Sequence, residues 1–151
     1  MTNSKKLLVM RGIPGAGKST LVSSRAPSAV VCSADHFFTQ PDGRYVFDGS
    51  KLGRAHDQCY ATFLHAVSDD VESVAVDNTN LTWKSMSRYV EGGLDHGYEV
   101  ELLDVITPHA VAAARCVHNV PASVVQKLAA SQLTIPQYII DNPKFKHTIV
   151  K

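Results

Sequence analysis

The sequence predicts a three-layer α/β fold, in which helices cover both faces of a mostly parallel sheet of four to five strands. Three observations predict this fold: short apolar runs alternate with helix-length segments, a glycine-rich loop joins the first run to the first helix, and polar residues follow the ends of the runs. Alternating strands and helices are typical of parallel sheets, because a parallel connection needs a crossover. The length of 151 residues suits a single domain, residues 1–151.

Four apolar runs are expected to form the strands, and the first of them leads into the glycine-rich loop. Short, continuous apolar runs are typical of strands that are buried on both faces. The runs comprise residues 6–11, 29–32, 74–76 and 98–106. In such sheets, ligands bind beyond the carboxyl ends of the strands. The loop, and the aspartates that follow the second and third runs, Asp35 and Asp77, are therefore candidates for a functional site.

Helices are expected between and after the strands. The first ends before Pro27, which cannot continue a helix, and the third is followed by Gly97, a typical helix-terminating residue. We expect Trp83 to start that third helix and to pack against the sheet. The expected helices comprise residues 19–25, 52–68, 83–96, 108–119 and 121–133. In the tail, residues 134–151, the stretch 147–150 is either a short edge strand or a disordered end.

The composition is that of an ordinary globular protein. Apolar residues make up 44% of the chain and charged residues 19%, and a net charge of +1 gives no overall attraction to nucleic acid or membranes. The first eleven residues hold too few apolar side chains for a signal peptide or a membrane span, so a cytoplasmic protein with no membrane partner is expected. The cysteines Cys32, Cys59 and Cys116 are far apart and are interpreted as small buried hydrophobic residues.

The glycine-rich loop, residues 12–19, matches the pattern G-x-x-x-x-G-K-[ST] at every fixed position and predicts a nucleoside triphosphate site. Its glycines let successive backbone N–H groups turn toward phosphate oxygens, and the following helix points its positive dipole end at the same anion. Lys18 is expected to reach the β and γ phosphates, and the Ser19 hydroxyl to ligate Mg²⁺. The expected nucleotide-binding residues are Gly12, Pro14, Gly15, Ala16, Gly17, Lys18, Ser19 and Thr20.

The residues at the strand ends favour a kinase over a nucleotide-hydrolysing switch. A guanine nucleotide switch needs an N-K-x-D or T-K-x-D element, and the chain contains neither. Phosphoryl transfer to a hydroxyl needs a carboxylate near the incoming proton, a metal ion and cations around the transition state. Asp35 and Asp77 are the candidate carboxylates.

Several motifs together resemble the polynucleotide-kinase-like P-loop kinases, the family of phage polynucleotide kinase, and most of all the kinase module of the NEDD4-binding protein 2 group. The resemblance runs from about Leu7 to about Leu128, the kinase-like core. It is carried by the glycine loop and by Ser33-Ala34-Asp35-His36-Phe37-Phe38, Asp42-Gly43-Arg44-Tyr45-Val46-Phe47, Ala55-His56, Val76-Asp77-Asn78-Thr79-Asn80-Leu81, and Arg115 followed by His118.

The resemblance implies roles for individual residues, with ATP and Mg²⁺ as cofactors. Asp35 would be the general base on the acceptor's 5′-hydroxyl, next to the catalytic Lys18. Asp77, Thr79 and Asn80 would lie near the acceptor and the metal. Arg115, on a lid helix, would bind the donor phosphates and neutralise charge during transfer. The resemblance thus implies transfer of the γ-phosphoryl group of ATP to the 5′-hydroxyl of a single-stranded nucleic-acid end or a nucleotide.

One residue departs from the pattern of the phage enzymes. Phe38 stands where they place an arginine that holds the acceptor's 3′-phosphate. Phe38 and Phe37 can stack on a base, as aromatic residues do in single-strand binders. The basic residues Arg44, Lys51 and Arg54 can contact phosphates, and His56, which matches a family histidine, can touch the acceptor. The alternative is that one phenylalanine packs in the core, the other covers a loop, and the basic residues form a solvated face.

Two other functions remain open from the sequence. The acceptor can be a hydroxymethylated base in DNA or the hydroxyl of a small molecule, because the family's acceptor arginine is missing. The chain can also be a nucleotide-binding interaction module without turnover. ATP rather than GTP is implied by the resemblance alone, since no base-reading element is evident, and the sequence does not indicate the oligomeric state.

Overall fold

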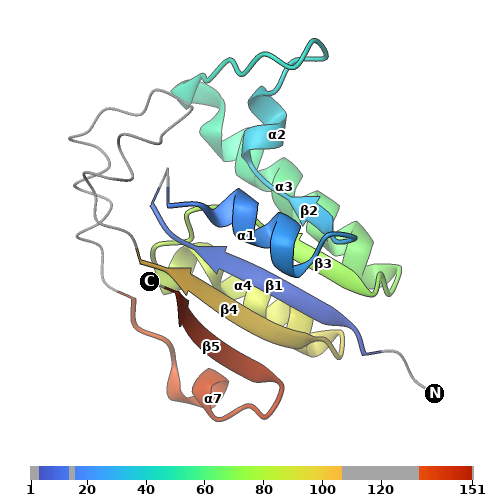
Figure 1. Cartoon of the computed structure of the whole chain (residues 1–151), viewed down its shortest axis with the longest axis vertical. Coiled ribbons are helices and arrows are strands. Elements are labelled where there is room, and N and C mark those ends of the chain that lie inside the picture. Colours follow the sequence, from blue (N-terminus) through green and yellow to red (C-terminus); the bar gives the residue numbers. More distant parts are fainter. Residues whose placement is uncertain (1–3, 14–15, 107–132, 151) are drawn as a thin grey trace.

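The computed structural model describes residues 4–13, 16–106 and 133–150. It contains a five-stranded sheet in the order β2-β3-β1-β4-β5, with every neighbouring pair parallel (Figure 1). The strands are β1 Lys6–Arg11, β2 Val30–Cys32, β3 Ser73–Val76, β4 Glu99–Val105 and β5 Phe145–Val150. The predicted α/β fold is therefore confirmed. The end of the tail forms the edge strand β5, and of the two alternatives for residues 147–150 the strand is correct.

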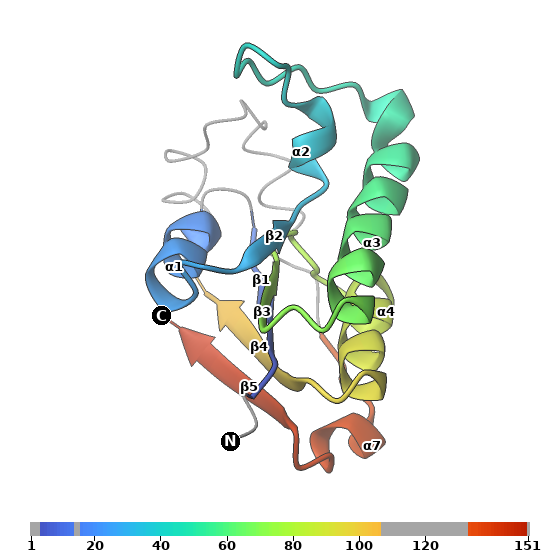
Figure 2. The ribbon, with the colours of Figure 1, turned by 90° about the vertical axis from the view of Figure 1, so that its right-hand side faces the viewer.

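Helices cover both faces of the sheet. Helix α1 lies on one face, while α3 and α4 lie on the other (Figure 2). The helices are α1 Lys18–Arg25, α2 Asp35–Phe38, α3 Leu52–Ser68, α4 Trp83–Asp95 and α7 Gln137–Ile140, and the 3₁₀ helix η1 spans Gly49–Lys51. The two helices expected between residues 108 and 133 fall on a segment outside the described residues, apart from Leu133. None of the described helices is long and apolar enough to cross a membrane.

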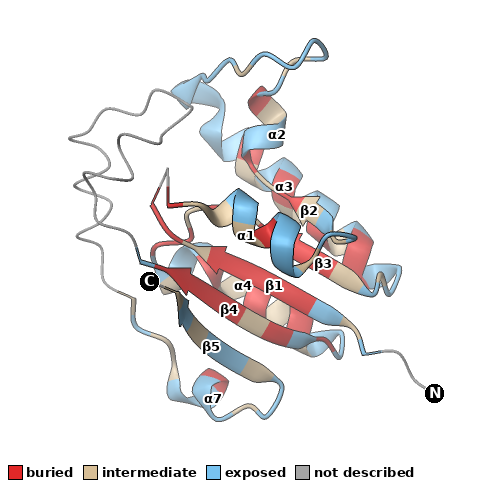
Figure 3. Cartoon of the chain, viewed as in Figure 1, coloured by how far each residue is buried: buried red, intermediate tan, exposed pale blue. Residues whose placement is uncertain are grey.

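The hydrophobic core has two main parts, one on each side of the sheet. The larger part lies between the sheet and helices α3 and α4, and the smaller lies under α1. Figure 3 shows β1 and β4 buried along most of their length and the edge strand β5 largely accessible. Cys32 and Cys59 are buried in the larger part, as predicted, and burial raises the pKa of Cys32 to about 12. Cys116 lies outside the described residues.

Local signals in the sequence set both ends of α4. The Thr82 side chain and Ser85 form a capping box at its start, where each side chain satisfies a backbone N–H of the first turn. Trp83 begins the helix and is partly buried against the larger core, as predicted. At the other end, Gly97 has φ +81, a conformation that L side chains rarely adopt. Gly97 therefore ends the helix as expected.

The close packing of α4 on the sheet depends on a second glycine. A Cβ atom added to Gly93 would lie 2.5 Å from Cδ2 of Leu7 and 3.1 Å from Cγ2 of Val100, and both neighbours are buried. We expect Gly93→Ala to destabilise the fold by about 1–3 kcal/mol relative to Gly53→Ala, because overpacking forces buried side chains to move. Gly53 lies in α3 with no heavy atom within 4 Å of an added Cβ. Gly53→Ala therefore changes the free energy of unfolding only through the higher helix propensity of alanine. Urea unfolding would measure both variants, and equal free energies of unfolding would contradict the account.

Candidate active site at the carboxyl edge of the sheet

The glycine loop joins the end of β1 to the start of α1 and leaves little room for side chains. A Cβ added to Gly12 would lie 3.1 Å from the carbonyl oxygen of Val105 and 3.3 Å from Cδ of Lys18. Gly17, just before α1, has φ +95, which favours glycine. The loop therefore needs glycine at both positions, as expected for a loop that turns its backbone N–H groups toward an anion. Pro14 and Gly15 lie outside the described residues.

Lys18 and the first turn of α1 place polar groups at this loop. The Lys18 ammonium donates a hydrogen bond of 2.9 Å to the carbonyl oxygen of Ile13, so the cation lies over the loop. Ser19 and Thr20 follow it on the exposed first turn of α1. The N-terminus of a helix attracts anions through its backbone N–H groups and its dipole. A cation, a helix N-terminus and a tight glycine turn thus converge where the sequence predicts phosphates.

The end of β3 meets the first turn of α1 at a pair of oxygen atoms. The Ser19 hydroxyl donates a hydrogen bond of 2.7 Å to Oδ2 of Asp77. Hydroxyl and carboxylate oxygens suit Mg²⁺, which binds few protein ligands and completes its shell with water and phosphate oxygens. Among the described residues no group of three or more His, Cys, Asp or Glu side chains could hold a metal. The oxygen atoms of Ser19 and Asp77 fit Mg²⁺, and Asp77, expected near the acceptor and the metal, contacts the donor loop.

The loop after β3 is hydrogen-bonded to both neighbouring strand ends. Asp77 N–H donates to the carbonyl oxygen of Cys32 at 2.9 Å, and Oδ1 of Asn78 accepts from Ala34 N–H at 2.9 Å. The first bond ties the loop to the end of β2, and the second ties it to Ala34, the residue before Asp35. On the other side, Gly12 N–H donates to the Thr79 carbonyl oxygen at 3.0 Å. One short loop thus connects the glycine loop with the segment that carries Asp35.

Asn80 has a structural position rather than the predicted contact with the acceptor. It is only 3% exposed, its φ is +48, and its side-chain amide donates to the carbonyl oxygen of Met10 at 2.9 Å. Asparagine tolerates this left-handed backbone better than most residues. The prediction that Asn80 binds the acceptor is therefore wrong: its amide satisfies a buried carbonyl at the end of β1. Thr79 holds Gly12 through its main-chain carbonyl, and a substrate contact of its half-buried side chain stays a prediction.

A buried ionic network supports the same edge from beneath. Arg11, the residue before the glycine loop, donates to Oδ1 of Asp104 at 2.9 Å and to the carbonyl oxygen of Leu81 at 3.0 Å. The other carboxylate oxygen of Asp104 lies 3.2 Å from Nε2 of His147 on β5. Buried ion pairs hold geometry when their remaining hydrogen-bonding groups are satisfied. The ends of β1 and β4, the middle of β5 and the loop after β3 are thus joined through one guanidinium and one carboxylate.

Asp35 begins α2, directly after β2, and its side chain is exposed to solvent. Its Oδ1 accepts a hydrogen bond of 3.0 Å from the Tyr45 hydroxyl, which reaches back from a turn closed by the bridge between Thr39 and Tyr45. A solvent-accessible carboxylate that is oriented by a neighbouring hydroxyl suits the role of a general base. Sequence reasoning missed Tyr45 as a partner, because nothing in the spacing indicated that the turn folds back onto Asp35.

His56 lies on α3, within electrostatic reach of Asp35. Burial lowers the pKa of His56, and the nearby Arg88 lowers it further, while Asp35 and Asp57 act in the opposite direction. Arg88 also donates to the His56 carbonyl oxygen at 3.2 Å. The lowered pKa favours a neutral imidazole near neutral pH, which can donate or accept a hydrogen bond. Its contact with an acceptor stays a prediction.

Phe38 is buried, contrary to the prediction that it stacks on a base. Its side chain is 2% exposed and packs with Ala34 and Ala55 in a small core cluster, with Phe37 at a ring distance of 5.2 Å. A ring in this position presents no face to a ligand. The alternative expectation, one phenylalanine in the core, is therefore the correct one for Phe38.

The predicted basic residues lie on the surface beyond α2. Arg44 is exposed and pairs with Asp42 at 2.6 Å, and Arg54 is exposed at the start of α3. Surface pairs such as Arg44 and Asp42 contribute little stability and exchange partners readily. Both cations are accessible, and their contact with acceptor phosphates stays a prediction. Arg115, expected at the donor phosphates, lies outside the described residues.

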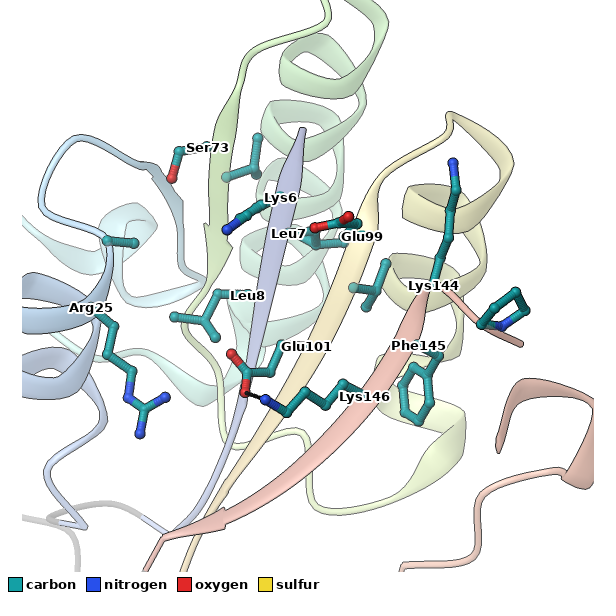
Figure 4. A pocket seen from close by; sticks show the side chains of 14 residues that line it. Lys6, Leu7, Leu8, Arg25, Ser73, Glu99, Glu101, Lys144, Phe145 and Lys146 are labelled. Atoms are coloured by element: carbon teal, nitrogen blue, oxygen red, sulfur yellow. Dashed lines mark ion pairs between the residues drawn. The ribbon is translucent and has the colours of Figure 1, made fainter. Parts of the chain in front are cut away.

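A hollow of about 390 Å³ lies at the opposite, amino-terminal end of the strands (Figure 4). Lys6, Arg25 and Lys146 point into it together with Glu101, which pairs with Lys146 at 3.9 Å and accepts from Thr148 at 2.6 Å. In parallel α/β sheets ligands bind at the carboxyl ends of the strands. The hollow is thus separate from the candidate active site.

Comparisons with known proteins agree with this geometry. A family model described as an AAA domain matches residues 7–134. Human NEDD4-binding protein 2 is 36% identical over 97 residues, which are 62% of this chain and 5% of that much longer protein. A chain of the Pnkp1/Rnl/Hen1 RNA repair complex has a TM-score of 0.69 at 20% identity, over 91% of this chain and 46% of that one. A sugar kinase from Janibacter has a TM-score of 0.62 at 17% identity, over 97% and 84% of the two chains.

These structural likenesses, at low identity, show the fold. The family match spans most of the chain, residues 7–134. The chain therefore belongs to the AAA-domain family.

Proposed function

We propose that the chain is an ATP-dependent kinase that transfers the γ-phosphoryl group to the 5′-hydroxyl of a nucleic acid. One observation carries the proposal: the loop after β3 supplies Asp77 to the Ser19 hydroxyl on the donor side and holds the main chain before Asp35 through Asn78. A loop with these two attachments keeps a phosphate-binding loop and an accessible carboxylate in a constant relative position. Phosphoryl transfer depends mainly on such positioning and on electrostatic stabilisation.

The donor half binds the triphosphate. Backbone N–H groups of the glycine loop and of the first turn of α1 would face the phosphate oxygens, with Lys18 and Thr20 beside them. Ser19 and Asp77 would hold Mg²⁺, which when bound neutralises charge on the β and γ phosphates. Arg115 is proposed to add a further cation at the donor phosphates. The hydrogen bond of 2.7 Å from the Ser19 hydroxyl to Oδ2 of Asp77 is the geometric support for this assignment.

The acceptor half activates the hydroxyl. Asp35 accepts the proton of the 5′-hydroxyl while the oxygen of that hydroxyl forms a bond to the γ phosphorus. The bond between the γ phosphorus and the β–γ bridging oxygen breaks at the same time, and ADP leaves. The Tyr45 hydroxyl, bonded to Oδ1 at 3.0 Å, orients the Asp35 carboxylate during this step. His56 is proposed to contact the acceptor, and Arg44, Lys51 and Arg54 to contact its phosphates. A cytoplasmic location agrees with these substrates.

The base assignment predicts that Asp35→Asn lowers γ-phosphoryl transfer to 5′-hydroxyl oligonucleotides by roughly 10²- to 10⁴-fold, the usual contribution of a general base. ATP binding should be unchanged, because Asp35 does not line the glycine loop. Transfer from labelled ATP, together with ATP titration, measures both quantities. Asp69→Asn is the matched control, since it removes an exposed carboxylate at the end of α3, away from the proposed acceptor residues.

An acceptor panel separates this function from its alternatives. Transfer to 5′-hydroxyl ends of single-stranded DNA or RNA supports the proposal. Products phosphorylated only on a hydroxymethylated base, or only on a small-molecule hydroxyl, would replace it with a different kinase. Tight ATP binding without transfer to any acceptor would identify an interaction module. GTP in place of ATP tests the nucleotide preference in the same assay.

The metal assignment predicts that Asp77→Asn raises the Mg²⁺ concentration needed for half-maximal transfer by roughly tenfold or more. The reason is that the amide replaces a charged oxygen ligand while Ser19 keeps its place. Asp69→Asn, an exposed carboxylate after α3, serves as the control and should titrate like the wild type. A Mg²⁺ requirement identical in Asp77→Asn and wild type would contradict the assignment.

A further inference from the structure

We propose that Phe47 is the stacking platform for the first base of a single-stranded acceptor. The inference rests on the proposed kinase function and names the part of the acceptor site that the sequence misplaced onto Phe38. Figure 1 shows the segment that carries Phe47 projecting beyond α2, and Figure 3 shows this projection as exposed.

Buried Phe38 anchors the projecting segment. The N–H of Val46 donates to the Phe38 carbonyl oxygen at 2.9 Å. The Phe38 ring also contacts two rings of the segment, Phe47 at 5.1 Å and Tyr45 at 6.1 Å between centroids. Tilted and edge-on ring contacts of this kind add stability beyond the burial of area. The position of Phe47 is therefore determined by the core, although the residue itself lies outside it.

Phe47 nevertheless presents most of its ring to solvent. It is 56% exposed, and the part that is covered lies near Gly49 and Phe38. Val46 and Leu52, close to it in sequence, are also largely exposed. Single exposed apolar side chains are ordinary, but three within seven residues around a supported aromatic ring indicate a surface that binds something. A largely exposed aromatic ring that core contacts hold in position is suited to stack on a base, as aromatic residues do in single-strand binders.

The segment also connects this ring to the proposed general base. Tyr45, two residues before Phe47, bonds to Asp35 through its hydroxyl. Residues two apart in an extended chain have Cα atoms about 7 Å from each other. Both rings contact Phe38, so they lie on the same side of the segment. A nucleotide whose 5′-hydroxyl reaches Asp35 therefore has its base within reach of Phe47.

The net charge of the segment around Phe47 is compatible with binding a nucleotide, but it is small. Residues 42–54 contain three basic side chains, Arg44, Lys51 and Arg54, and two acidic ones, Asp42 and Asp48, a net charge of +1. Hydrogen bonds from Ser50 lower the pKa of Asp48 and occupy its carboxylate at the start of η1. With so few uncompensated cations, stacking rather than phosphate contact should carry acceptor affinity. We therefore expect a shallow dependence of oligonucleotide affinity on salt.

The test compares wild type, Phe47→Ala and Phe47→Trp on two oligonucleotides, one ordinary and one without the first base. Phe47→Ala should raise the KM of the ordinary oligonucleotide by roughly five- to a hundredfold, the range of one base–aromatic stack, and leave the KM of ATP unchanged. Phe47→Trp should have a KM for the ordinary oligonucleotide close to that of the wild type. The oligonucleotide without the first base should have the same KM with wild type and Phe47→Ala. Tyr138→Ala removes an aromatic residue that is 64% exposed on α7 and should change nothing.

Each contrary outcome is distinct. If the wild type phosphorylates oligonucleotides and Phe47→Ala has the same KM, the platform is wrong and the kinase function stands. If the wild type neither phosphorylates nor binds a fluorescent oligonucleotide in an anisotropy titration, both proposals fall. If Phe47→Ala instead dissociates an oligomer in sedimentation, the surface is an interface between protein chains and not a base platform. Circular dichroism verifies that the exposed substitution leaves the fold intact.

Discussion

The hydrogen bonds of the loop after β3 are the constraint on which the site depends. Parallel strands bring their carboxyl ends to one edge, but the order of the sheet separates the strand of Asp35, β2, from the glycine-loop strand, β1, by β3. Asn78 bonds to Ala34, and Thr79 bonds to Gly12, so the loop after β3 spans both neighbours. Buried polar groups are costly unless paired, and each bond therefore favours one register. The hydrogen bonds of the loop therefore also fix the position of the glycine loop relative to Asp35.

The surroundings of this loop explain why it can be rigid. Asn80 satisfies the end of β1, and Arg11 reaches from the same strand to Leu81 and to buried Asp104. A misplacement of reacting groups by about 1 Å can lower the rate of a reaction a hundredfold. Hydrogen bonds on several sides of the loop therefore help to keep the reacting groups in position. Beyond this frame, Tyr45 and Phe47 extend the acceptor side outward from Phe38.

The sequence predicted the parts of the site that depend on local patterns. The glycine loop, the alternating strands and Asp35 at a strand end all follow from spacing and periodicity. Contacts between distant segments did not follow, and Ser19 and Asp77, 58 residues apart, form one. Phe37, Phe38 and Phe47 are equally plausible platforms by residue type, and only the fold of the turn shows which ring faces solvent. Asn80 misled for the same reason: an amide suits a ligand and a buried carbonyl equally well.

We propose that the loop after β3 holds the two halves of the site in register, and Asn78→Ala is the variant that disrupts this connection. The variant removes the side-chain bonds of Asn78 to Ala34 N–H and to Sγ of Cys59, and it keeps the main-chain bond between Thr79 and Gly12. We predict that it lowers the rate of labelled γ-phosphoryl transfer at saturating ATP by at least about tenfold, while ATP affinity stays within about twofold of wild type. Asn142→Ala, which removes a similar bond to Lys144 N–H far from the site, should change neither. Unchanged transfer, or equal losses of transfer and ATP affinity, would contradict the claim.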